Sequence, residues 1–323
     1  MASLLSVENL QVQFQTKKGI NTAVDGVSFS VEKGRILGIV GESGCGKSVT
    51  SMSILQLLGS NARISGGSIK LDGKELIGLP EKEMCRIRGN DIAMIFQDPM
   101  TALNPTLTIG TQLMEPIMLH QNCGKKEAWK RAVDVLKRVG IAAPEKRMKE
   151  YPHQLSGGMR QRVMIAMAVS CEPRLLIADE PTTALDVTIQ AQILELMCEL
   201  REKMGTAIML ITHDMGVVAE TADDVLVLYA GKAVEYGSIE DIFERPKHPY
   251  TQGLLNSIPR LDEDVELLNT IEGTVPAPDA MPAGCRFAPR CPYGKDRCMK
   301  EKPGVYHAGN SLVSCFRYEG EKE

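Results

Sequence analysis

Short apolar runs alternate along the chain with segments of helical length. The apolar runs end in polar residues or glycine, and they span residues 35–40, 92–96, 175–178 and 207–211. The helical segments lie at residues 47–58, 126–139 and 188–204. Buried strands that alternate with helices are typical of a mostly parallel sheet covered by helices. The pattern therefore predicts an α/β fold.

Two stretches depart from this alternation. Strand-like pieces at 7–14 and 68–71 come early, and the second is followed by Asp72-Gly73, a dipeptide that favours a tight hairpin turn. We therefore expect a small antiparallel layer attached to the parallel sheet. Residues 98–151 contain four prolines around one helical pattern, which predicts a mainly helical insertion with irregular ends.

The composition changes toward the C-terminal end. Nine of the 17 prolines lie between Pro246 and Pro303, and the segment shows neither a helical nor a strand period. We place the main domain boundary near residue 255, which gives a first domain of residues 1–255 and an extension of residues 256–323. Within the first domain, the helical insertion is expected to span about residues 98–165.

Composition and charge exclude several classes of protein. Of the 323 residues, 43% are hydrophobic and 24% charged, values that exclude an intrinsically disordered chain. A net charge of −4 without a long basic run gives nucleic acid little to bind. No stretch reaches the roughly 18 apolar residues of a membrane-spanning helix, and no signal-peptide pattern precedes Glu8. We expect a cytoplasmic protein, in which the nine cysteines are not a disulfide framework.

A glycine-rich motif follows the first apolar run. Residues 41–48 read Gly-Glu-Ser-Gly-Cys-Gly-Lys-Ser and match G-x-x-x-x-G-K-[ST] between a predicted strand and a predicted helix. Glycines let backbone N–H groups converge on phosphate oxygens, and the helix N-terminus adds favourable partial charge. Lys47 is expected to bind the β and γ phosphates, and Ser48 to bind Mg²⁺. The alternative is an ordinary glycine turn.

Two adjacent carboxylates end a second apolar run. Asp179 and Glu180 follow the strand predicted at 175–178, and ligands bind at the carboxyl ends of strands in open α/β sheets. Asp179 is expected to hold Mg²⁺ through water, and Glu180 to polarise the attacking water. Together with the loop at 41–48, the pair makes hydrolysis of a nucleoside triphosphate the leading chemistry.

Further motifs identify a family resemblance. Residues 155–161 read Leu-Ser-Gly-Gly-Met-Arg-Gln and resemble the signature sequence of the ATP-binding cassette (ABC) family. Gln97 resembles the family's Q-loop, Ala184-Leu185-Asp186 its D-loop, and His213 its H-loop. The resemblance implies a RecA-like core with an antiparallel β layer and a helical lobe inserted after Gln97. It also implies head-to-tail pairing, in which the loop at 41–48 faces the signature of another subunit across ATP.

The resemblance assigns roles to the matching residues. Catalysis is expected from Glu180, His213 and Gln97, and Mg²⁺ binding from Ser48, Gln97 and Asp179. ATP contacts within the subunit are expected from Phe14, Ser43, Gly44, Cys45, Gly46, Lys47, Ser48 and Val49. Contacts to the ATP of the paired subunit are expected from Ser156, Gly157, Gly158 and Gln161, next to Asp186 of the D-loop. Phe14 would stack on adenine and Val24 would line the ribose, and the alternative for Phe14 is a core position in a strand.

The extension carries two more features. His248-Pro249-Tyr250-Thr251 is followed by Cys285-x5-Cys291-Pro292-x5-Cys298-x16-Cys315, and both resemble the ATPase subunits of bacterial oligopeptide and dipeptide importers, a subgroup that includes nickel and glutathione systems. Four cysteines in a reducing compartment suit a metal centre. The irregular spacing and the Cys-Pro pair favour a [4Fe-4S] cluster, with zinc or uncoordinated thiols as alternatives and His307 as a substitute ligand.

These observations predict the ATP-hydrolysing subunit of a peptide importer. The expected partners are a second ABC ATPase subunit, two transmembrane permeases and, indirectly, an extracytoplasmic substrate-binding protein, which places the chain at the cytoplasmic face of the membrane. Nickel or glutathione import is the alternative for the same machinery. A soluble ABC ATPase acting on nucleic acid, or an ATP-binding subunit without turnover, fits less well, because no coiled-coil insertion is present and the catalytic motifs are intact.

Overall fold

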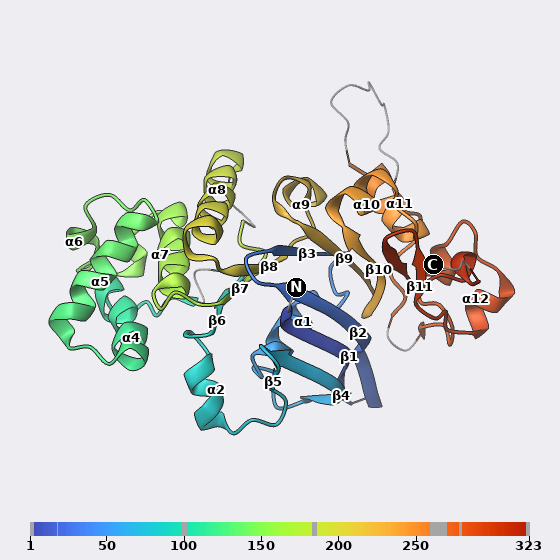
Figure 1. Ribbon diagram of the computed structural model, residues 1–323, viewed down its shortest axis with the longest axis horizontal. Coiled ribbons are helices and arrows are strands. Elements are labelled where there is room, and N and C mark those ends of the chain that lie inside the picture. Colours follow the sequence, from blue (N-terminus) through green and yellow to red (C-terminus); the bar gives the residue numbers. More distant parts are fainter. Residues whose placement is uncertain are drawn as a thin grey trace. The chain divides into compact units, whose positions relative to one another are not determined.

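The computed structural model describes residues 3–17, 19–98, 102–182, 186–258, 270–277 and 280–320 (Figure 1). The chain forms two compact units. The first is built from residues 1–31, 36–77 and 212–323, and the second from residues 32–35 and 78–211.

The first unit contains an antiparallel layer whose strand order is β2-β1-β4-β5. The strands are β1 (Ser3–Thr16), β2 (Gly19–Glu32), β4 (Ala62–Leu71) and β5 (Lys74–Glu75). Asp72 and Gly73 both adopt positive φ angles, of 50° and 80°, between β4 and β5. Two successive left-handed residues match the twist of a hairpin, so the turn predicted from this dipeptide is confirmed.

The first unit also contains a row of strands in the order β11-β12-β10-β9-β3. Their bounds are β3 (Ile36–Val40), β9 (Asp224–Tyr229), β10 (Lys232–Ser238), β11 (Tyr306–Ala308) and β12 (Ser311–Val313). Only β3 and β9 pair in parallel, while β9, β10, β12 and β11 are antiparallel. The sheet is therefore mixed, because a tight connection at Ala230-Gly231, with φ angles of 46° and 81°, folds β10 back along β9.

Among the described residues of the first unit, five α-helices and a short 3-10 turn flank or follow these strands. They are α1 (Lys47–Ile54), α9 (Met215–Thr221), α10 (Ile239–Glu244), α11 (Pro249–Asn256), the short 3-10 turn Ala288–Arg290, and α12 (Asp296–Lys300). A further 3-10 turn spans Phe316–Tyr318. The boundary predicted near residue 255 falls within α11. The C-terminal segment predicted to lack a period is thus made of short elements and turns.

The second unit has a parallel core of three buried strands in the order β8-β7-β6. Their bounds are β6 (Ile92–Ile95), β7 (Leu175–Asp179) and β8 (Ala207–Ile211), each within one residue of an apolar run in the sequence. Every residue of the three strands is buried, which explains why the runs are continuously apolar rather than alternating. The α/β class is confirmed here.

Helices make up most of the rest of the second unit. They are α2 (Glu81–Ile87), α4 (Ile109–Gln121), α5 (Lys125–Arg138), α6 (Pro144–Arg147), the 3-10 turn Pro152–Gln154, α7 (Gly157–Val169) and α8 (Val187–Met204). The predicted insertion holds several helices rather than one. One of them, α4, was not expected because it continues through Pro116, a residue that usually ends a helix. No helix in the described ranges is long and apolar enough to cross a membrane.

Candidate functional site

The glycine-rich loop lies between β3 and α1, and its shape depends on close backbone approach. Gly41 has φ of 150°, and a Cβ atom there would lie 2.1 Å from the carbonyl oxygen of Leu228. Gly46, with φ of 97°, is the N-cap of α1, and its Cβ would lie 3.0 Å from the carbonyl oxygen of Ala23. The amide of Gly231 donates to the carbonyl of Cys45 at 2.9 Å. Gly41 is therefore required by packing as well as by φ, and Gly46 is required by φ.

Lys47 is buried at the start of α1, with 6% of its surface exposed. Its Nζ atom donates to the carbonyl oxygens of Gly41, at 2.6 Å, and Glu42, at 3.2 Å. The ammonium is thus held by the loop's own backbone. Five of the expected ATP-contact residues differ in exposure: Ser43, Gly44 and Ser48 are exposed, Val49 is half-buried and Cys45 is buried. Burial raises the pKa of the Cys45 thiol, which stays protonated at neutral pH.

The expected adenine-stacking residue lies in the antiparallel layer. Phe14 pairs with Ala62 across β1 and β4 and is half-buried rather than part of the core. It lines a cavity of about 330 Å³ together with Ile20 and Arg63. Val24 is fully buried, and its Cγ2 atom would lie 3.4 Å from a Cβ atom at Gly46. Phe14 therefore keeps a surface that a planar ring could contact, whereas Val24 packs behind the glycine loop.

In the second unit, Gln97 and Glu180 come together. β7 ends at Asp179, which is 4% exposed, and the amide of Glu180 donates to the carbonyl of Ile211 at 2.8 Å. Because β6 and β7 are adjacent and parallel, the residues after their carboxyl ends meet at the same edge. The Nε2 atom of Gln97 donates to Oε2 of Glu180 at 2.8 Å. Two residues predicted to act in catalysis are thus in direct contact.

The signature residues form the N-terminus of α7, a helix of 13 residues. Ser156 is the N-cap, and its Oγ atom accepts from the amide of Met159 at 3.4 Å. Ser156 and Gly157 are exposed, and a Cβ atom at Gly157 would meet nothing within 4 Å. Backbone N–H groups at this open helix end favour an anion. Gln161 is instead buried, and its amide donates to the carbonyl of Pro181 within its own chain.

The remaining predicted motifs lie at the starts of two helices. Ala184 and Leu185 of the D-loop lie outside the described residues, and Asp186 is the N-cap of α8, where its Oδ1 atom accepts from the amide of Ile189 at 2.9 Å. His213 is exposed directly after Thr212. Its neighbour Asp214 caps α9. Asp186 thus has a structural role of its own beside the predicted one.

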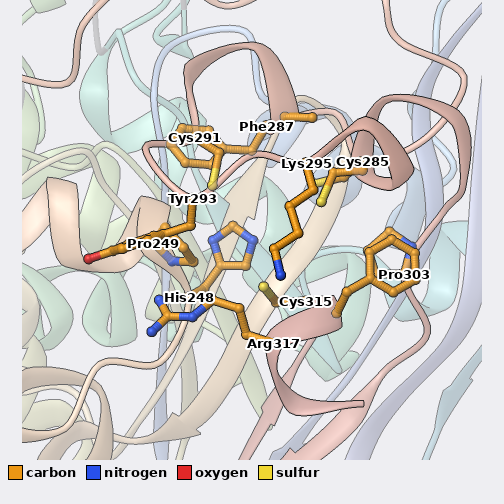
Figure 2. A pocket seen from close by; sticks show the side chains of 13 residues that line it. His248, Pro249, Cys285, Phe287, Cys291, Tyr293, Lys295, Pro303, Cys315 and Arg317 are labelled. Carbon is orange, nitrogen blue, oxygen red and sulfur yellow. The ribbon is translucent and has the colours of Figure 1, made fainter.

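The four C-terminal cysteines line one cavity of about 80 Å³ (Figure 2). The sulfur atoms of Cys285, Cys291 and Cys315 surround the space beside the His248 ring, and Cys298 is the fourth cysteine of the lining. Burial raises the pKa of Cys285 to about 11 and raises those of Cys291 and Cys315. Without a metal, these thiols are therefore protonated at neutral pH, and metal binding has to displace their protons.

The described part of the chain contains no group of three or more His, Cys, Asp or Glu residues placed to hold a metal ion. His307, expected as a substitute ligand, is exposed on β11 and does not line the cysteine cavity. His248 lines it instead, and burial lowers the pKa of this residue to about 3. Its Nδ1 atom accepts from the amide of Tyr250 at 3.1 Å, so the neutral ring carries its proton on Nε2. The position of His307 could not be predicted, because spacing along the chain does not show which side chains share a cavity.

Two residues outside the predicted site contact the glycine loop. The hydroxyl of Tyr250 accepts from the amide of Glu42, and the guanidinium of Arg290 pairs with the Glu42 carboxylate. Tyr250 belongs to the quoted His-Pro-Tyr-Thr motif, so a signal for it was present. The sequence did not identify Arg290, because a single arginine next to a cysteine cannot be told from an ordinary surface arginine.

Comparisons with known proteins agree with the motifs. A family model described as ABC transporter matches residues 24–183, and one described as oligopeptide/dipeptide transporter, C-terminal region, matches residues 234–298. The oligopeptide transport ATP-binding protein AppD of Bacillus subtilis is 56% identical over 99% of this chain and 98% of its own length. The corresponding OppD of Escherichia coli is 52% identical over 98% of this chain and 93% of its own length.

Solved structures show the same architecture. A dimeric post-hydrolysis state of the ATP-binding cassette MJ0796, bound to ADP and Pi, has a TM-score of 0.66 and 28% identity, and covers 73% of this chain and 98% of its own. The structure of cbiO1 from Clostridium perfringens, part of the complex cbiONQ, has a TM-score of 0.64 at 28% identity, over 76% of this chain and 92% of its own. The predicted cassette fold is confirmed, whereas neither comparison bears on a metal in the extension.

Proposed function

Because the chain belongs to the ABC transporter family, we propose that it is the ATP-hydrolysing subunit of an importer for dipeptides or oligopeptides. The observation that carries the proposal is similarity at 50% identity or more, over nearly the full length, to oligopeptide and dipeptide transport ATP-binding proteins. The match includes the C-terminal region that gives the second family model its name. Nickel or glutathione import by the same machinery is the alternative, since the cargo is selected by other subunits.

Different residues of this chain have different roles in ATP binding and hydrolysis. The loop at 41–48 binds the phosphates of ATP, with Lys47 on the β and γ groups, and the exposed N-terminus of α7 binds the γ phosphate of a paired cassette. Glu180 takes a proton from the attacking water, and the Gln97 amide orients the Glu180 carboxylate. His213 contacts the γ phosphate. Bound Mg²⁺ neutralises phosphate charge, with Ser48, Asp179 and Gln97 as its proposed ligands.

The assembly is proposed to contain two different ATPase subunits, two transmembrane permeases and an extracytoplasmic binding protein. ATP closes the paired cassettes and hydrolysis reopens them, which moves the attached permeases. The chain accordingly acts at the cytoplasmic face of the membrane. Residues 1–255 form the proposed cassette, and residues 256–323 the proposed extension.

The test is affinity purification of the tagged chain from detergent-solubilised membranes, followed by mass spectrometry and reconstitution in liposomes. We expect two multi-span permeases and a second cassette ATPase to accompany it, and MgATP-dependent uptake of a labelled oligopeptide. Recovery only from the soluble fraction, together with nucleic acid or ribosomes, contradicts the transport role. Uptake of nickel or glutathione without peptide uptake identifies the alternative cargo.

We further propose that the cysteine cavity holds a [4Fe-4S] cluster. Four thiols that line one cavity suit a soft metal centre, and thiolates are the ligands that iron–sulfur clusters use. Zinc binds the same thiolate ligands and is the alternative. The irregular spacing of the cysteines along the chain and the Cys291-Pro292 pair favour a cluster over zinc. Cys285, Cys291, Cys298 and Cys315 are the proposed ligands.

Metal analysis of anaerobically purified protein tests the cluster. We expect iron and acid-labile sulfide, both reduced in the Cys291→Ser variant and unchanged in the matched Cys85→Ser variant, whose thiol is exposed on α2. One zinc per chain without iron contradicts the iron–sulfur assignment. Neither metal in any preparation leaves the third alternative, four uncoordinated thiols.

A further inference from the structure

The glycine loop at 41–48 carries one acidic side chain, that of Glu42. It is bound by a residue of the segment that holds the four C-terminal cysteines, residues 285–315, which we call the cysteine region. The Nη1 atom of Arg290 lies 2.9 Å from Oε1 and 3.0 Å from Oε2 of Glu42. The Arg290 side chain is 6% exposed and that of Glu42 is 30% exposed. Because solvent is largely excluded from one partner, this ion pair is stronger than the usual surface pair.

Arg290 is held in place by its own surroundings. Its Nε atom donates to the carbonyl of Glu272 at 2.9 Å, and its Nη2 atom donates to the carbonyl of Ile271 at 3.2 Å. The guanidinium also lies 5.8 Å from the ring centre of Tyr229. A guanidinium with several fixed partners is preorganised, so little side-chain entropy is lost when it binds Glu42. The residue that follows it, Cys291, lines the cysteine cavity.

A second contact reaches the same residue of the loop. The Tyr250 hydroxyl oxygen accepts a hydrogen bond from the backbone N–H of Glu42, with 2.9 Å between the oxygen and the nitrogen. Tyr250 is fully buried and packs against Tyr229 and Phe287, with ring centres 4.7 and 5.4 Å away. Phe287 also lines the cysteine cavity. The backbone and the side chain of Glu42 are therefore both fixed by residues from the C-terminal part of the chain.

Fixing Glu42 also fixes the lysine that binds phosphate. Lys47 donates to the carbonyl oxygens of Gly41 and Glu42, so the position of its ammonium depends on where these two residues lie. A shift of Glu42 therefore changes both the backbone of the loop and its principal cation. The contacts form one chain of interactions from Cys291 through Arg290 and Glu42 to Lys47.

We propose that Arg290 is a positioning residue for the phosphate loop, through which the cysteine region sets the affinity of this subunit for ATP. The inference rests on the proposed binding of ATP at residues 41–48. Arg290 has no contact with nucleotide in this scheme and acts through Glu42. This coupling is reciprocal. If bound ATP stabilises the intact cysteine region by a given free energy, disruption of that region weakens ATP binding by the same free energy.

The test is a double-mutant cycle read out by the dissociation constant of MgATP. The full-length subunit is titrated calorimetrically as wild type, Arg290→Met, Glu42→Gln and the double variant. We expect each single change to weaken binding about fivefold or more, and the double variant to bind no more weakly than the weaker single variant, because both remove one interaction. Arg290→Lys keeps the charge but not the fork of donors, and it should restore part of the affinity.

Several outcomes overturn the proposal. Affinity within twofold of wild type for Arg290→Met, or full additivity in the double variant, removes the route through Glu42. If Arg290→Met does not fold, the MgATP affinity of Glu42→Gln alone tests the proposal, because the Glu42 side chain is partly exposed. Unchanged MgATP affinity of Glu42→Gln also overturns the proposal. Arg138→Met, which removes an exposed guanidinium from α5, is the matched control and should bind MgATP as wild type does.

Two further readouts separate positioning from general destabilisation and from failure of the proposed function. In the assembled transporter, Arg290→Met should raise KM for ATP and leave kcat unchanged, because Gln97 and Glu180 are intact. A lower melting temperature with unchanged affinity and KM indicates a merely structural role. If wild type itself does not bind MgATP, or Lys47→Ala binds it equally well, the ATP site at 41–48 is wrong, whatever Arg290 does.

Discussion

The side-chain amide of Gln97 donates a hydrogen bond to a carboxylate oxygen of Glu180 at 2.8 Å. The two residues follow adjacent parallel strands, β6 and β7, so the sheet itself sets their separation. An amide N–H that binds one carboxylate oxygen orients the carboxylate without protonating it. Gln97 therefore positions the group that is proposed to act as the base in ATP hydrolysis.

Shortening this amide should slow turnover. In Gln97→Asn the donor is one methylene group too short to reach Glu180, and we expect kcat for ATP to fall about tenfold, within the worth of a hydrogen bond to a charged group. The measurement is steady-state ATPase activity of the assembled transporter. Gln192→Asn, at an exposed position of α8, is the control and should keep wild-type turnover. Equal activity of the two variants would show that Gln97 does not orient the base.

Replacing the base itself should separate binding from turnover. Glu180→Gln keeps the shape of the side chain but cannot accept a proton, so we expect kcat to fall by about 100-fold or more while the dissociation constant of MgATP changes little. Calorimetry and ATPase assays on the same preparation measure both quantities. Glu195→Gln, an exposed glutamate on α8, is the matched control. Full activity of Glu180→Gln would remove this residue from catalysis.

The buried ammonium of the loop should be required for affinity. Lys47→Ala removes the cation and leaves the carbonyls of Gly41 and Glu42 without the donor shown here. We expect MgATP to bind at least about tenfold more weakly, since a charge-assisted contact to phosphate is lost. Lys70→Ala on β4 changes a lysine outside the loop and should bind MgATP normally. Unchanged affinity of Lys47→Ala would contradict the phosphate-loop assignment.

Asp25 should stabilise the fold over the neutral pH range. Its Oδ2 atom binds Arg286, Lys302 and Lys232 at 3.1 to 3.2 Å, and its side chain is 14% exposed. Burial alone raises the pKa of Asp25, but Lys232 and Lys302 outweigh this effect and hold the pKa below its usual 3.8. A carboxyl with a lowered pKa contributes stability that is present above its unfolded pKa and lost as pH falls through the folded value.

We therefore expect Asp25→Asn to lower the free energy of unfolding by about 1–3 kcal/mol, because three cations lose a shared charged partner. The loss should be the same at pH 5 and pH 8, since the carboxylate is ionised throughout that range. Urea denaturation at both pH values measures it, with Asp134→Asn on the exposed face of α5 as the control. A loss at pH 8 that vanishes at pH 5 would show that the pKa of Asp25 is raised instead.

Features encoded by short contiguous segments could be predicted from the sequence. The strand, glycine loop and helix at residues 36–54 follow from an apolar run and a motif that share one stretch of chain. The same holds for β7 and its terminal carboxylates. The hairpin of β9 and β10 was missed because Ala230-Gly231 is not one of the dipeptides that announce a tight turn, although both residues adopt left-handed angles.

Contacts between distant segments could not be predicted. Glu42 and Arg290 are 248 positions apart, and nothing in either neighbourhood specifies the other. The cysteine spacing correctly directed attention to one segment, but only the fold shows that His248, rather than His307, shares the cavity with the four thiols. Pairings of this kind depend on the tertiary fold, which local periodicity does not determine.

The close approach of Gly41 to the carbonyl of Leu228 has a consequence for biosynthesis. The glycine loop leaves the ribosome long before the backbone that supports it, by roughly 10–40 s at ordinary rates of translation. Over that interval the nascent chain has the motif but not the tertiary contacts of the loop. Nucleotide can therefore act as a folding ligand only after translation has passed β9, so a ribosome-bound chain stalled before that strand should show no ATP-dependent protection from protease.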